Sequence, residues 1–138
     1  MTNASKCLLV GLLLVLASGV ALADDLKGAS RIVCSAAQAT VCADDGECET
    51  DLPWTWNIPQ FIEIDLAGKM LATTKASGEN RQTPIETMKR EEGWIFLQGV
   101  ENGRAFSFAL EEETGLLTVA VARPGLTVSV FGACTPMP

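Results

Sequence analysis

The acidic residues Glu63 and Asp65 form the pair whose type and spacing could support catalysis. They lie two positions apart in an alternating segment, so their carboxylates project from the same face of a predicted strand. Paired carboxylates of this kind act in glycoside hydrolysis, and a carboxylate-dependent hydrolase acting on a glycan is one alternative. The pair also fits the polar face of a half-buried strand that carries Ile62, Ile64 and Leu66 on its other face. We favour this second, structural interpretation.

The 138-residue chain contains no histidine. Histidine is the usual general base near neutral pH and a frequent metal ligand, and the Ser-His-Asp and Cys-His nucleophilic sites require it. With 17 acidic residues, 10 basic residues and a net charge of −7, the chain also lacks the cationic excess of nucleic-acid-binding proteins. We therefore expect a protein that is not an enzyme, uses no cofactor and binds no nucleic acid.

Two acidic clusters raise the question of metal binding. The segment from Asp44 to Asp51 places five carboxylates in eight residues, and such oxygen ligands attract calcium. The spacing does not match an EF-hand, so a calcium-stabilised structural module is an alternative and no metal site is predicted. The second cluster, Glu111-Glu112-Glu113, fits a solvated hairpin tip that keeps a sheet soluble.

Trp54 and Trp56 lie in a short segment bounded by prolines. If the segment is extended, two tryptophans at positions i and i+2 point the same way. Aromatic pairs of this kind bind sugars or cap apolar pockets, so both residues are candidate ligand contacts. The alternative is that the two indoles close one end of the core.

Residues 1–23 have the features of a secretory signal peptide. Lys6 precedes an apolar stretch, and Ala21-Leu22-Ala23 is the small-x-small pattern that signal peptidase accepts. The apolar stretch is shorter than the roughly 20 residues that a membrane-spanning helix needs. We predict cleavage after Ala23, an exported protein that is periplasmic or secreted, and a single β domain over residues 24–138 without a membrane span.

The four cysteines beyond this segment indicate two disulfides. They are Cys34, Cys42, Cys48 and Cys134, and an even number in an exported protein is typical of a disulfide framework. Three pairings are possible. We favour Cys42–Cys48, which closes a short acidic loop, together with Cys34–Cys134, which joins the first segment to the last. A zinc site made of the four thiolates is disfavoured because the C-x2-C pairs of zinc ribbons are missing.

The remaining chain alternates apolar and polar residues with a period of two, which predicts strands separated by turns. The expected strands are 61–66, 70–74, 85–89, 94–98, 105–110, 116–122 and 126–133, with another near 31–34. Asn102-Gly103 is the strongest hairpin signal, because a type I′ turn requires positive φ at both central positions. Trp94 and Phe96 are assigned to the core, and Ala36 to Ala43 could form one short helical turn.

The predicted fold class is all-β: an antiparallel meander of about eight short strands that forms a small closed or partly open barrel. Closure removes the two exposed edge strands that an open meander would have. The Cys34–Cys134 disulfide would place the first and last strands side by side in such a barrel. A sandwich or a half-open sheet is the alternative.

Several short motifs give the chain a family resemblance. The early cysteines are followed by the tryptophan segment, Ile64-Asp65, Thr114-Gly115 in a late turn and a terminal Phe131-Gly132-Ala133-Cys134. This arrangement resembles small exported four-cysteine β proteins of Proteobacteria that have no assigned function. In architecture the predicted barrel is also similar to lipocalin-like barrels and periplasmic lysozyme inhibitors. The lipocalin Gly-x-Trp signature is absent, however, and the chain has no tyrosine.

We therefore predict an exported, non-enzymatic binding or inhibitor-type β domain. Its partner would be a small apolar ligand held in the barrel mouth, or an envelope protein or glycan met by the loops, with Trp54 and Trp56 as candidate contacts. The acidic charge favours a basic protein among the possible protein partners. The alternatives are a hydrolase that uses Glu63 and Asp65, and a calcium-stabilised module.

Overall fold

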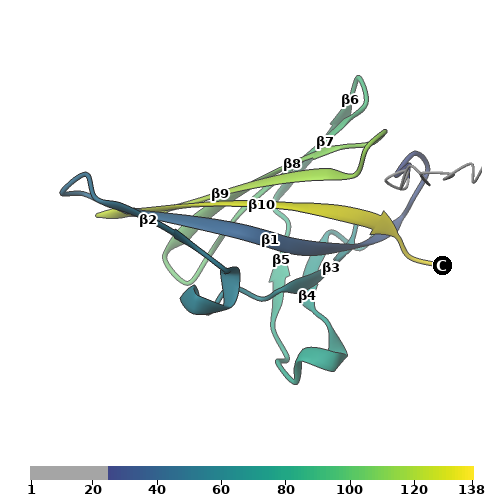
Figure 1. The fold of residues 1–138 in the computed structure, drawn as a ribbon. Helices are drawn as coiled ribbons and strands as arrows, with labels where there is room; N and C mark the ends of the chain where they lie inside the picture. Colours follow the sequence, from purple (N-terminus) through teal and green to yellow (C-terminus); the bar gives the residue numbers. More distant parts are fainter. Residues whose placement is uncertain (1–24) are drawn as a thin grey trace, which may run out of the picture.

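The computed structural model describes residues 25–138, so the predicted signal peptide and its cleavage site lie outside the described residues. The described chain is all-β and antiparallel, as predicted, and its strands form one curled sheet that makes a half-barrel (Figure 1). Within this part of the chain, no helix has the length and apolar character needed to cross a membrane.

The sheet contains ten strands, two more than predicted. In chain order they are β1 (Arg31–Ala43), β2 (Cys48–Asp51), β3 (Phe61–Asp65), β4 (Met70–Thr73), β5 (Gln82–Pro84), β6 (Thr87–Glu91), β7 (Trp94–Glu101), β8 (Arg104–Glu111), β9 (Leu116–Arg123) and β10 (Leu126–Pro136). Two 3-10 helices, η1 (Pro53–Trp56) and η2 (Lys75–Ser77), lie in the connections. Neighbouring strands follow the order β5-β4-β3-β1-β10-β9-β8-β7-β6, and β2 pairs with β1 outside this path.

The first and last strands are paired, and both predicted disulfides are confirmed. Cys34 of β1 lies opposite Cys134 of β10, and the two form a disulfide across a sequence separation of 100. Cys42 and Cys48 form the second disulfide at the turn between β1 and β2. Figure 1 shows β1 and β10 as long neighbouring strands. Two disulfides are typical of proteins that fold in oxidising compartments.

The predicted helical turn over Ala36–Ala43 is wrong, because strand β1 continues through those residues. β10 pairs with β1 along one edge, while β3 and β2 pair with the first and second parts of its other edge. Hydrogen bonds along both edges outweigh the helix preference of an alanine-rich segment, which is a weak determinant of structure. The register shifts between Ala36 and Gln38, which is a β-bulge of the kind that bends a strand.

The meander is open between β5 and β6. These two strands at the ends of the sheet are consecutive in the chain and are joined by Ile85 and Glu86. The predicted strand 85–89 therefore begins two residues too early, because β6 starts at Thr87. The Ile85 amide donates to the carbonyl of Lys69, and the Glu86 amide donates to the carbonyl of Gln98, both at 2.9 Å. The linking residues thus attach to both ends of the sheet, and the half-barrel is the partly open form of the predicted barrel.

The inward residues of β7, β8 and β9 supply much of the core, which includes Ile95, Leu97, Phe106, Phe108, Leu110, Leu117 and Val119. The prediction that Trp94 and Phe96 are core residues is wrong, because they lie on the opposite face and are 43% and 39% exposed. The period of two defines the two faces of a strand but does not say which one is buried. Ile95 and Leu97 take the inward positions instead.

The residues that precede β1 close the core near the end of β8. Glu112 is the residue that follows this strand. The side chain of Leu26 is fully buried there, and its amide donates to the Glu112 carbonyl at 2.7 Å. Arg90 donates to the Leu26 carbonyl at 3.0 Å and forms an ion pair with the Glu112 carboxylate. The predicted solvated tip is therefore wrong for Glu112, which is a buried residue. The negative charge of Glu112 is tolerated at this buried position because the Arg90 guanidinium forms an ion pair with it.

Candidate functional site

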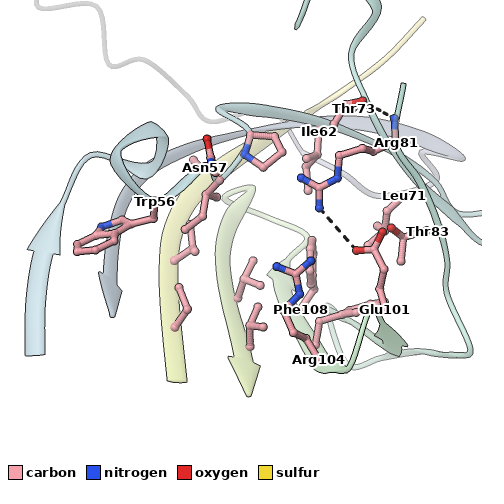
Figure 2. Close-up of a pocket in the computed structure, with 18 of the residues that line it drawn as sticks. Trp56, Asn57, Ile62, Leu71, Thr73, Arg81, Thr83, Glu101, Arg104 and Phe108 are labelled. Carbon is pink, nitrogen blue, oxygen red and sulfur yellow. Dashed lines mark hydrogen bonds and ion pairs between the residues drawn. The ribbon is translucent and has the colours of Figure 1, made fainter. Parts of the chain in front are cut away.

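The concave face of the half-barrel surrounds a cavity of about 450 Å³ (Figure 2). Its lining comes from both parts of the sheet: β8, β9 and β10 on one side, and the region around β3, β4 and β5 on the other. Most of the lining side chains are apolar. They include Trp56, Ile58, Ile62, Leu71, Phe106, Phe108, Leu117, Val119, Val121, Val128 and Val130.

Strand register arranges the apolar wall into rows. Two consecutive rows cross β8, β9 and β10, and their members are Phe106, Val121 and Val128 in one row and Phe108, Val119 and Val130 in the next. Because every second residue of a strand points to the same face, both rows face the cavity. Phe106 and Phe108 also contact each other edge to face, with ring centroids 5.8 Å apart.

The next row in the same register is charged. Glu101 lies opposite Arg104 in the β7–β8 hairpin. Ala105 lies opposite Ala122, so Arg104 at the start of β8 and Arg123 at the end of β9 occupy neighbouring positions. Glu101 and both arginines line the cavity. The cavity therefore has an apolar wall and a charged end.

Arg81 reaches this charged end from the other part of the sheet. Its guanidinium forms an ion pair with Glu101 at 3.7 Å between Nη2 and Oε2. Its amide donates to the Thr73 hydroxyl at 3.1 Å, which attaches the residue to the end of β4. Figure 2 shows Arg81, Glu101 and Arg104 close together at one end of the pocket. The Arg81–Glu101 pair thus links the two parts of the half-barrel beside the cavity.

The predicted contacts Trp54 and Trp56 are separated by the structure. Their segment is the 3-10 helix η1 rather than an extended strand, so the two indoles do not share a face. Pro53 favours this helix because a proline is accommodated in the first turn of a helix. Trp54 is 53% exposed, whereas Trp56 lines the cavity and has a buried Nε1 atom without a hydrogen-bond partner. Only Trp56 of the predicted pair belongs to the site.

Glu63 and Asp65 lie away from the cavity. In β3 they alternate with Ile62, which lines the cavity, and with Ile64, which is buried. Arg31 donates to Glu63 at 3.3 Å, and Asp65 accepts a 2.7 Å hydrogen bond from an amide in the following turn. Both carboxylates therefore have local structural contacts, and neither lines the cavity.

The carboxylates of the acidic loop between β1 and β2 are not grouped closely enough to hold a metal ion together. Asp45 accepts a hydrogen bond from the Glu47 amide at 3.0 Å, which stabilises the turn. Across residues 25–138, no three acidic or cysteine side chains are placed so that they could hold a metal ion together. The geometry of this loop gives the calcium alternative no support.

Sequence reasoning missed the three arginines of the pocket, Arg81, Arg104 and Arg123. A signal was present for two of them: Arg104 follows the Asn102-Gly103 turn, and Arg123 precedes the turn with Gly125. In a meander the turns alternate between the two ends, so the β7–β8 and β9–β10 turns share one end. The arginines beside those turns must then lie close together.

Comparison with protein families and with curated proteins identifies no relative of this chain. No protein-family model matches it, and no curated protein matches it significantly. The site is therefore interpreted from its own geometry and chemistry.

Proposed function

We propose that this protein is a binding domain that takes up an apolar small molecule in the cavity of its half-barrel. The observation that carries the proposal is the cavity itself, with a volume of about 450 Å³ and rows of valine and phenylalanine on its wall. Small-molecule sites are typically apolar clefts of about 300–1,000 Å³ with a few polar groups that fix the orientation of the ligand. This cavity matches that description in size and lining.

The chemistry of the lining supports binding rather than catalysis. Its one acidic residue, Glu101, is paired with Arg81, and its other charged residues are arginines. Arginine does not lose its proton in proteins, so it is a poor general base. No cysteine, serine or lysine lines the cavity, and its hydroxyl groups belong to Thr73 and Thr83, of which Thr73 donates to the Glu79 carbonyl at 2.9 Å. These residues can hold and orient a ligand.

The free energy of binding would come mainly from removing apolar surface from water. Each buried methylene contributes about 0.8 kcal/mol. Affinity should therefore rise with the length of a neutral alkyl ligand until the cavity is full, and then level off.

The test is a fluorescence titration with the neutral apolar probe N-phenyl-1-naphthylamine. Val128→Trp places a large side chain into the cavity and should weaken binding by about tenfold or more, because the ligand and the indole compete for one space. Ser129→Trp is the matched control, since Ser129 is the next residue of β10 and lies exposed on the other face. Circular dichroism should show that both variants are folded.

Two results would contradict the proposal. One is that the wild-type protein does not bind the probe or any member of a neutral alcohol series. The other is that Ser129→Trp weakens binding as much as Val128→Trp, which would place the probe outside the cavity.

A further inference from the structure

The charged end of the cavity contains two arginines that form no ion pair with a carboxylate among residues 25–138. The chain has five arginines, and three of them pair with carboxylates: Arg31 with Glu63, Arg81 with Glu101 and Arg90 with Glu112. The other two, Arg104 and Arg123, take part in none of the ion pairs of residues 25–138. These two are the arginines that occupy neighbouring positions beside the apolar rows.

This arrangement is unexpected in an acidic protein. With 17 acidic residues and 10 basic residues, carboxylates are abundant enough to pair with every cation. Two adjacent guanidinium groups repel each other, and the repulsion is stronger next to an apolar wall than in open water. Arg104 is half-buried at that wall, and Arg123 beside it is exposed. A bound anion would relieve the repulsion and supply the missing partner for both groups.

We infer that the ligand of this pocket is an anionic amphiphile, a carboxylate with a long apolar tail, whose carboxylate binds between Arg104 and Arg123. The inference rests on the proposed function, because it names the class of ligand for the same cavity. The guanidinium group binds carboxylates through two parallel hydrogen bonds, which orients the ligand as well as attracting it.

The position of the tail follows from the strand register. Phe106 lies two residues beyond Arg104 on β8, and Val121 lies two residues before Arg123 on β9, so both share the inward face with their arginines. The apolar row therefore begins directly beside the anion site. From Arg104 to Phe108 the strand rises about 13 Å, at roughly 3.3 Å per residue. A medium-length acyl chain can lie along this wall while its carboxylate stays at the charged end.

The test uses three ligands with the same tail and different head groups: dodecanoate, dodecanol and dodecyltrimethylammonium. Binding is measured by isothermal titration calorimetry below the micellar concentration of each compound. Dodecanoate should bind at least about tenfold more tightly than dodecanol, because it gains charge-assisted hydrogen bonds. The cationic ligand should bind most weakly. Added salt should reduce the preference for dodecanoate.

The variants Arg104→Gln and Arg123→Gln should each remove most of the preference for dodecanoate over dodecanol. Circular dichroism should show that each variant keeps its fold. Arg31→Gln is the matched control, because Arg31 is a partly exposed arginine that pairs with Glu63 away from the cavity. It should bind all three ligands as the wild type does.

The outcomes separate this inference from the proposed function. If dodecanoate and dodecanol bind equally well and the two variants change neither affinity, the anion site is wrong and the apolar pocket stands. If none of the three ligands binds, the proposed function fails and the inference fails with it. If Arg31→Gln abolishes the preference as well, the effect comes from the overall charge, and a specific site is refuted.

Discussion

Gly132 is the residue on which the close approach of β1 and β10 depends. It lies opposite Ala36, where the register of the two strands shifts. A Cβ atom at this position would overlap the carbonyl oxygen of Ser35, which belongs to the backbone and cannot rotate away. The requirement for glycine is therefore steric, since φ at Gly132 is not in the left-handed region.

We expect Gly132→Ala to lower the free energy of unfolding by about 1–3 kcal/mol, the cost of forcing extra volume into a packed site. Urea denaturation would measure the change. Ser129→Ala on the same strand is the control, because Ser129 is exposed and should change stability by less than about 0.5 kcal/mol. Equal stability of Gly132→Ala and the wild type would show that the two strands can separate locally at no cost.

The strands β1 and β10 lie at the centre of the sheet, whereas the short strands β2 and β5 each pair with one strand only. β1 has partners along both edges, because β10 pairs on one side and β3 and β2 share the other. β5 has only three residues and pairs only with β4, while all four residues of β2 are exposed. The stability of the sheet should therefore fall from its centre toward these short strands.

Hydrogen exchange measured by mass spectrometry or NMR should show this gradient. The amides of β1 and β10 should exchange most slowly, at a rate set by global unfolding, because opening them breaks the centre of the sheet. The amides of β2 and β5 should exchange orders of magnitude faster by local opening. Equal protection of β5 and β10 would mean that the half-barrel opens only as a unit.

The disulfide Cys34–Cys134 holds the whole molecule together from its first strand to its last. It closes a loop with a sequence separation of 100, whereas Cys42–Cys48 closes one of only six. In the chain-entropy model a disulfide stabilises the fold by restricting the unfolded chain, and longer loops give larger effects. The two bridges should therefore differ in their contribution to stability although both lie on β1.

Replacing Cys34 and Cys134 together by alanine should lower the free energy of unfolding by up to about 4.7 kcal/mol. The same change at Cys42 and Cys48 should cost about 2 kcal/mol. Thermal and urea unfolding of the two double variants would measure the difference. A larger loss at Cys42 and Cys48 would show that the acidic loop stabilises the native state in a way that loop entropy does not describe.

Local sequence patterns predict much of the fold but only part of the candidate site. The alternation of apolar and polar residues predicts a strand over 105–110, and the structure confirms it as β8. Trp56 lines the cavity, although its segment is helical rather than extended, and its role as a ligand contact stays a prediction. Arg81 was not predicted, because its proximity to Glu101 depends on how the two parts of the sheet curl toward each other.

The sequence by itself determined the features that depend on neighbouring residues. Asn102 and Gly103 have φ values of 48° and 72°, as the predicted type I′ turn requires, because turn geometry is a property of the two residues themselves. Only the tertiary structure decided that Trp94 faces outward and that Arg81, from the other part of the sheet, meets Glu101 beside a cavity. Those outcomes depend on which face of the curled sheet closes over the core and on how strands far apart in the chain pair. No local pattern contains that information.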